Sequence, residues 1–186
     1  MLTEDNANID PSKPQPYISE ILNYKTGGKL LDVGAGWGRN SLFLAQKGFS
    51  VTAIEPDHKE LSRLKESSTN LGLPITLLPT DLSSIDFKDD FDVVVCAMVL
   101  HFLKSQKEVE QAITQLKMAT ITSGIHLISV LHENTYAVRT YFFKPGELKS
   151  YYSDWEILDY FEGLGPRIPS EGGRQFTKSI IIARKP

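Results

Sequence analysis

An apolar run that ends in an acidic residue and passes directly into a glycine turn predicts a strand, a tight turn and a helix near the start of this chain. Residues 30–33 read Leu-Leu-Asp-Val, residues 34–38 read Gly-Ala-Gly-Trp-Gly, and a helix-forming run starts at Arg39. Because glycine has no side chain, a strand–turn–helix of this kind brings backbone amides close to a ligand. The pattern is not the dinucleotide fingerprint, which requires a third glycine where Arg39 stands.

Asp32 distinguishes between the classes of nucleotide that such a turn can bind. We expect its carboxylate at the mouth of the turn, where it would repel a pyrophosphate even beside a helix N-terminus. The same charge attracts a ligand that carries an ammonium and a sulfonium group. The turn therefore predicts S-adenosylmethionine as the cofactor, with S-adenosylhomocysteine as the product.

Strand and helix patterns alternate along the rest of the chain. A short helix over residues 17–24 comes first, and helices follow at 39–47, after a capping box at Asp57 and Glu60, after a second one at Ser105 and Glu108, and at 147–151. The strands are expected near residues 29–33, 50–54, 75–78, 91–97, 124–131, 154–160 and 175–184, with a loop over 162–174. This alternation predicts an α/β fold, a Rossmann-like, doubly wound, mostly parallel sheet with helices on both faces.

Length and composition bound the remaining possibilities. The 186 residues suit a flexible N-terminal arm over residues 1–16 and a single domain over residues 17–186. A net charge of -3 argues against a nucleic-acid partner. The single cysteine, Cys96, is expected to be a small buried side chain, and we expect no metal site. Without a signal segment or a membrane-spanning run, the sequence predicts a cytoplasmic protein with no membrane partner, and leaves monomer or homodimer open.

Polar residues follow four of the expected strands, at the edge of the sheet where parallel strands end and ligands bind. Glu55 is placed to accept hydrogen bonds from the ribose hydroxyls, and Asp81 to accept one from the adenine amine. Each residue also has a purely structural interpretation, since Glu55 could cap a helix and Asp81 could form a turn. Together they predict a cofactor site formed by Asp32, Gly34, Ala35, Gly36, Arg39, Asn40, Glu55, Pro56, Asp81, Leu82, Cys96 and Met98.

Several of these motifs resemble a known family. Residues 31–38 are similar to the first motif of class I S-adenosylmethionine-dependent methyltransferases, and residues 91–95 to their fourth-strand motif. Three further segments resemble the tellurite-resistance (TehB-like) group of these enzymes, namely residues 38–45, 99–103 and 143–156. The resemblance runs from about residue 17 to the end of the chain, and implies a seven-stranded sheet whose last strand is antiparallel.

Two positions of the glycine turn depart from the family pattern. Ala35 stands where the family usually has cysteine, and Trp37 replaces a polar residue. We expect neither to abolish cofactor binding, although Trp37 reshapes the entrance of the expected pocket.

The resemblance also suggests what the chain methylates. It implies methyl transfer to a small molecule of the tellurite or selenite type, an oxyanion that the planar fork of an arginine matches. The expected catalytic residues are Arg174 and Arg167 in the loop over 162–174, and His101 after the fourth strand. Solvated arginines and a histidine that only caps a strand are the alternatives. Another thiol or oxygen acceptor, or a non-catalytic sensor of S-adenosylmethionine, is the alternative function.

The other histidines and a group of aromatic residues have open roles. His132 could act as a base for an acceptor that must lose a proton, but a surface position is the favoured interpretation. His58 and His126 are expected to be structural. A group of four aromatic residues could form a lid over the acceptor or belong to the core, namely Tyr136, Tyr141, Phe142 and Phe143.

Overall fold

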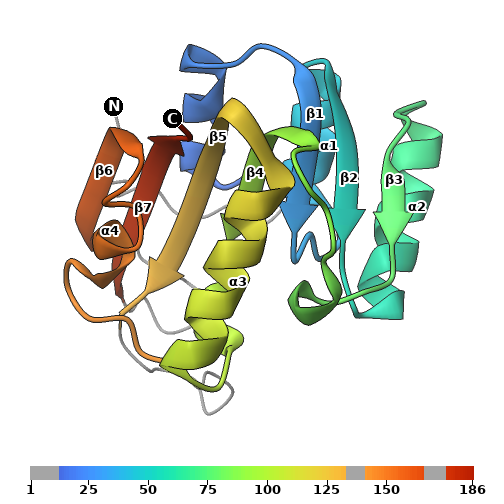
Figure 1. The fold of residues 1–186 in the computed structure, drawn as a ribbon. Helices are drawn as coiled ribbons and strands as arrows, with labels where there is room; N and C mark the ends of the chain where they lie inside the picture. Colours follow the sequence, from blue (N-terminus) through green and yellow to red (C-terminus); the bar gives the residue numbers. More distant parts are fainter. Residues whose placement is uncertain (1–12, 133–140, 166–174) are drawn as a thin grey trace.

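A single seven-stranded sheet runs through the structure, with the strand order β3-β2-β1-β4-β5-β7-β6 (Figure 1). The computed structural model describes residues 13–132, 141–165 and 175–186. Its strands are β1 (Gly28–Val33), β2 (Phe49–Ile54), β3 (Thr76–Leu78), β4 (Phe91–Ala97), β5 (Thr120–Leu131), β6 (Glu156–Leu164) and β7 (Thr177–Arg184). Pairs from β3 to β5 are parallel, whereas β7 is antiparallel to both β5 and β6. This confirms the predicted doubly wound, mostly parallel sheet and its antiparallel last strand.

Helices cover both faces of the sheet and enclose two apolar layers. The α-helices are α1 (Arg39–Gln46), α2 (His58–Asn70), α3 (Gln106–Ala119) and α4 (Glu147–Ser150), and the 3-10 helices are η1 (Pro16–Asn23), η2 (Leu82–Ser84) and η3 (Leu100–Phe102). The buried residues of η1 and α1 pack on one face, and those of α3 and α4 on the other, which is the face toward the viewer in Figure 1. Because β1 to β5 run in one direction, their carboxyl ends meet at one edge, and the amino end of β7 joins them there.

Two helix starts follow the predicted capping chemistry only in part. The Asp57 carboxylate accepts hydrogen bonds from the backbone amides of Lys59 and Glu60, and the Ser105 hydroxyl accepts one from the amide of Glu108. The reciprocal half of each box differs, because the Glu60 carboxylate pairs with Arg63 instead. In α3, the Glu108 carboxylate reaches one residue further back, to the amide of Lys104 at 2.9 Å.

The ends of β5 and β6 differ from the predicted boundaries. β5 starts at Thr120 rather than residue 124, and its first residues pair with β4 across a register shift. β6 continues to Leu164, so residues 162–164, predicted as loop, are strand. β6 is an edge strand that contains Gly163 and has no clear alternation of apolar and polar residues, so only its pairing with the distant β7 reveals its extent.

Gly38 provides a test of how the first helix packs. Its φ is +94°, and a Cβ there would lie 2.1 Å from the Leu64 Cδ1 atom of α2. Gly38→Ala should therefore lower the free energy of unfolding by about 2–4 kcal/mol, through backbone strain and overpacking together. Gly72→Ala is the matched control, because its φ is also positive but the space around it is open, and it should cost only about 1–2 kcal/mol. Urea denaturation measures both, and equal losses would contradict this packing.

Candidate cofactor and acceptor site

The glycine turn between β1 and α1 has one glycine that is open to its surroundings. The amides of Gly34 and Ala35 both donate to the carbonyl oxygen of Ile54, which fixes the turn to the end of β2. A Cβ on Gly34 would lie 2.4 Å from the Val99 Cγ2 atom, so Gly34 is required by packing. Around Gly36, whose φ is +55°, no atom lies within 4 Å of that position. Gly36 is therefore where the backbone of the turn is free to approach a ligand.

Glu55 joins the ends of the first two strands. Its Oε2 atom accepts a hydrogen bond from the Gly36 amide at 2.8 Å, and its Oε1 atom accepts one from the Asp57 amide at 2.9 Å. Pro56 between them is exposed. A carboxylate has about four acceptor positions, so these two bonds leave further positions for a ligand. The structural and the functional interpretations of Glu55 are thus compatible.

Asp32 lies beneath the turn and not at its mouth, so that part of the sequence prediction is wrong. The residue is 1% exposed, and its carboxylate accepts a hydrogen bond from the Ser41 hydroxyl at 2.5 Å. Burial raises the pKa of Asp32 to about 6, against the lowering effect of the Ser41 hydrogen bond, and the charge of Glu55 raises it further. The motif predicts an acidic residue at the right strand end, but it cannot show that Ser41 would cover it.

The first turn of α1 receives the N-terminal segment. The Asn40 side chain accepts a hydrogen bond from the amide of Gln15 at 3.0 Å, and Gln15 is itself buried although the sequence places it in the arm. Two residues later, the Tyr17 hydroxyl bonds to the Ser129 hydroxyl of β5 at 2.7 Å. Arg39 is half-buried beside them, and burial lowers its pKa. The start of η1 is thereby fixed to the first turn of α1 and to the last part of β5.

The ends of β3 and β4 carry the other predicted cofactor residues. Asp81 is exposed and caps η2, with its Oδ1 atom accepting from the Ser83 amide at 2.9 Å, while the neighbouring Leu82 is buried. Cys96 is fully buried, as predicted, and desolvation raises the pKa of its thiol. Met98 has a φ of +65°, a strained conformation for a residue with a side chain. Such strain is concentrated at functional sites.

A hollow of about 670 Å³ opens between η2 and the outer side of α3. Leu82, Ser83 and Leu103 line it together with residues of α3. Of the predicted cofactor residues, only Leu82 borders this hollow. It therefore lies next to the β3 end of the site and apart from the glycine turn.

Of the predicted acceptor residues, only His101 lies within the described part of the chain. Arg167 and Arg174 lie outside the described residues, as does Tyr136. His101 is buried in η3, and its carbonyl oxygen accepts a hydrogen bond from the Tyr141 amide at 3.3 Å. Of the two aromatic residues that follow Tyr141, Phe142 is exposed and Phe143 belongs to the core.

His126 has the structural role expected of it. Its ring is buried between the Thr120 and Tyr152 hydroxyls, and desolvation lowers its pKa to about 3. His58, by contrast, is exposed at the start of α2.

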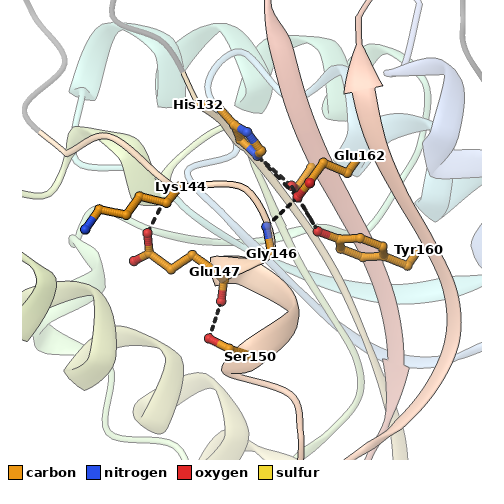
Figure 2. Close-up of polar contacts among 8 residues, drawn as sticks. His132, Lys144, Gly146, Glu147, Ser150, Tyr160 and Glu162 are labelled. Atoms are coloured by element: carbon orange, nitrogen blue, oxygen red, sulfur yellow. Dashed lines mark hydrogen bonds and ion pairs between the residues drawn. The ribbon is translucent and has the colours of Figure 1, made fainter.

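Sequence reasoning missed a polar cluster at the ends of β5, β6 and β7. His132, favoured as a surface residue, is only 8% exposed, and its Nε2 atom lies 2.6 Å from the Ser179 hydroxyl. Figure 2 shows His132, Tyr160 and Gly146 around the carboxylate of Glu162. The five residues of this cluster come from separate segments and give no motif, and the antiparallel pairing of β7 with both β5 and β6 brings them together.

The described parts of the chain lack two kinds of feature. Within residues 13–132, 141–165 and 175–186, no helix is long and apolar enough to cross a membrane. The same residues contain no group of three or more histidine, cysteine or acidic side chains that could hold a metal ion.

Comparison with known proteins connects the site to a family. The model of the family described as tellurite resistance protein TehB matches residues 15–175. The probable S-adenosyl-L-methionine-dependent methyltransferase TehB of Haemophilus influenzae strain Rd is 33% identical over an alignment of 165 positions, which covers 84% of this chain and 57% of that protein. The chain thus spans little more than half the length of the curated relatives it matches.

Solved structures agree with this comparison. The crystal structure of TehB from Haemophilus influenzae matches with a TM-score of 0.84 and 27% identity, over 93% of this chain and 63% of that one. The fold alone is shared with the 1,6-didemethyltoxoflavin-N1-methyltransferase of Burkholderia thailandensis, solved with 1,6-didemethyltoxoflavin and S-adenosylhomocysteine bound. Its TM-score is 0.72 at 21% identity, over 91% of this chain and 77% of that one. With its sequence matched to the family model over most of its length and the same fold in a solved member, this chain belongs to the TehB family of tellurite resistance proteins.

Proposed function

We propose that this chain is an S-adenosylmethionine-dependent methyltransferase that acts on a small molecule. The observation that carries the proposal is the Glu55 carboxylate, which is bonded to the amide of Gly36 beside the open side of the turn. A carboxylate at the end of the second strand accepts ribose hydroxyls in related nucleotide folds. Family membership supports the same cofactor, since the curated TehB relative is described as a probable S-adenosyl-L-methionine-dependent methyltransferase.

The chain's own residues fit the parts of such a cofactor. Glu55 would hold the ribose, and Gly36 lets the backbone approach it. The free amides at the start of α1, at Arg39 and Asn40, would face the methionine carboxylate. Asp32 beneath them supplies a negative charge that favours the ammonium and sulfonium groups, even though it does not reach the surface of the turn.

The adenine end of the site is assigned to the ends of β3 and β4. Asp81 and Leu82 would contact the ring at one side, with Cys96 and Met98 lining the other. Leu82 also borders the hollow beside α3, which is consistent with an accessible site at this end.

For the acceptor, we propose a tellurite- or selenite-type oxyanion bound by Arg174 and Arg167, next to His101. When bound, the cofactor supplies a methyl group on a sulfonium, a good leaving group. The protein's task is then to align the acceptor and exclude water, and the lone pair on tellurium or selenium is the nucleophile. The family description supports this acceptor. Another thiol or oxygen acceptor remains the alternative.

The proposal also covers the domain, the location and the partners of the enzyme. We place a single catalytic domain over residues 17–186, in the cytoplasm and without a nucleic-acid partner. The net charge of -3 and the absence of a basic cluster in the sequence support the last point.

Calorimetric titration with S-adenosylmethionine tests the cofactor assignment. Glu55→Ala should weaken binding about 10- to 100-fold, because charge-assisted hydrogen bonds to the ribose are lost. Glu66→Ala, which removes an exposed carboxylate of α2, is the matched control and should bind like the wild type. A folded wild-type protein that does not bind the cofactor would refute the proposal.

Transfer of labelled methyl groups to selenite and tellurite tests the acceptor. Arg174→Ala should lower the rate at least about tenfold, because the planar fork that holds the oxyanion is lost. Arg184→Ala, which removes a half-buried arginine paired with Glu156 far from the proposed site, should leave the rate unchanged. Turnover of labelled methyl would rule out a sensor. Transfer that occurs only to thiols or to other oxygen acceptors would overturn the oxyanion assignment.

Asp32 gives a pH-dependent signature in the cofactor-free protein. Its folded pKa of about 6 lies above its ordinary value of 3.8. The folded protein therefore binds this proton more tightly, so the associated stability is complete below pH 3.8 and is lost as the pH rises through 6. From pH 7 to pH 5, the free energy of unfolding of the wild type should rise by about 1 kcal/mol more than that of Asp32→Asn. Urea denaturation at both pH values measures this, and parallel changes in the two proteins would contradict the buried charge.

A further inference from the structure

A continuous chain of hydrogen bonds runs from the end of β5 to β6. His132 Nε2 lies 2.6 Å from the Ser179 hydroxyl, and that hydroxyl donates to Glu162 Oε2 at 3.0 Å. The same carboxylate oxygen accepts from the Tyr160 hydroxyl at 2.6 Å and from the Gly146 amide at 2.7 Å, as Figure 2 shows. The side chain of His132 is 5% exposed and that of Glu162 is 27% exposed. The cluster is therefore sheltered at its histidine end.

The donors and acceptors of this chain fix where the protons lie. Burial alone would raise the pKa of Glu162, but the hydrogen bonds from Gly146, Tyr160 and Ser179 outweigh it and lower that pKa, so the carboxylate is ionised and only accepts. A hydroxyl has a single proton, and Ser179 uses its proton on Glu162. The Ser179 oxygen must then accept from His132, which makes Nε2 the protonated ring nitrogen. In the neutral ring, Nδ1 consequently carries the lone pair.

The topology places this ring at the same edge of the sheet as the proposed cofactor residues. The cofactor residues proposed above follow β1, β2, β3 and β4. β5 is the next strand, joined to β4 in the register Ala97 with Ser129, and His132 follows its last residue. The Met98 amide donates to the carbonyl oxygen of Ser129, which fixes the ends of β4 and β5 together. His132 therefore lies one strand beyond the proposed cofactor residues at the end of β4.

We propose that His132 is a general base of the methyl transfer, held by Ser179 and Glu162, and that the acceptor carries an ionisable proton. The inference rests on the proposed function and specifies its acceptor. In this step, the nucleophilic atom of the acceptor forms a bond to the methyl carbon, and the sulfur–carbon bond breaks with its electron pair going to sulfur. The proton of the acceptor moves to Nδ1 of His132, whose imidazolium is stabilised by the Glu162 carboxylate 3.9 Å from Nε2.

Two kinds of acceptor share this chemistry. A hydrogen-oxyanion of selenium or tellurium still carries an O–H group, which becomes far more acidic once the lone pair of the central atom is methylated. A thiol or hydroxyl carries its proton on the nucleophilic atom itself. In both, the acceptor becomes a stronger nucleophile when a nearby base takes this proton, and assays with selenite and with a simple thiol distinguish the two sources.

The charges around His132 determine the direction of its pH dependence. On β6, Glu162 is the nearest charge, and Tyr160 is bonded to it. From α4, the ammonium of Lys149 lies over the Tyr160 ring. Lys178 of β7 lies over the rings of Tyr17 and Phe161, on the other face of the sheet. Glu162 is therefore the charge that favours the imidazolium, and Glu162→Gln should lower the pKa of His132.

Nitrogen-15 NMR of the four histidine rings tests the proton arrangement directly and requires no cofactor. His132→Gln identifies the resonances of His132 by their disappearance. The neutral ring should show a protonated Nε2 and an unprotonated Nδ1, and its pKa should fall in Glu162→Gln. The control is Glu156→Gln, which changes an exposed glutamate at the opposite end of β6. A protonated Nδ1 in the neutral ring would overturn the inference.

Kinetics test the catalytic role. His132→Gln keeps a donor for Ser179 but has no base, so kcat at pH 7 should fall about 10²- to 10⁴-fold while S-adenosylmethionine affinity stays within twofold. The deficit should narrow as the pH rises and the acceptor ionises unaided. In Glu162→Gln, the acidic limb of the pH–rate profile should move to lower pH, and in Glu156→Gln it should not.

The outcomes separate this inference from the proposed function. If the wild type transfers methyl groups and His132→Gln is as fast at every pH, the general base is refuted and the methyltransferase stands. If the folded wild type does not bind S-adenosylmethionine, the proposed function fails and the catalytic role of His132 fails with it, whatever the NMR tautomer.

Discussion

The hydrogen bond between the Gly36 amide and the Glu55 carboxylate is the interaction on which the candidate site depends. It joins the ends of two parallel strands, and it orients an acidic side chain beside a piece of backbone that no side chain covers. The tight packing of Gly34 against Val99 and of Gly38 against Leu64 holds the turn in place on either side. A rigid turn with one open glycine is what a nucleoside needs, because binding then requires little ordering of the protein.

Charge is distributed unevenly around this turn. Asp32 lies below it, shielded by Ser41, whereas Glu55 remains half-buried at its side. The site therefore combines a buried charge that acts through space with a surface carboxylate that acts by hydrogen bonding. At the other end of this edge of the sheet, the Glu162 carboxylate lies near the His132 ring and favours its protonated, positively charged form. In the proposed reaction, acidic side chains therefore lie near both the cationic cofactor and the proton that the acceptor releases.

Local patterns in the sequence were sufficient to predict most of the fold. The apolar run over residues 91–97 predicts β4 with its observed bounds, and Asp57 and Ser105 begin their helices as predicted. These features depend on neighbouring residues and on strand or helix periodicity. The antiparallel last strand came from family resemblance alone, since no periodicity reveals the direction of a strand.

What the sequence could not predict depends on contacts between distant residues. The burial of Asp32 under Ser41 needs the turn of α1 to be in place, and the His132 cluster needs β6 and β7 to pair over residues 162 and 179. The extra length of β6 was hidden for the same reason. A single residue such as His132 gives no local sign of whether it is exposed, because its burial is decided by strands that lie later in the chain.

A crystal structure of the chain with S-adenosylhomocysteine would locate the nucleoside relative to the glycine turn. Both ribose hydroxyls should donate to Glu55 beside Gly36, and the adenine should lie toward Leu82. A nucleoside bound elsewhere, or a phosphate group seated on the glycine turn, would contradict this assignment.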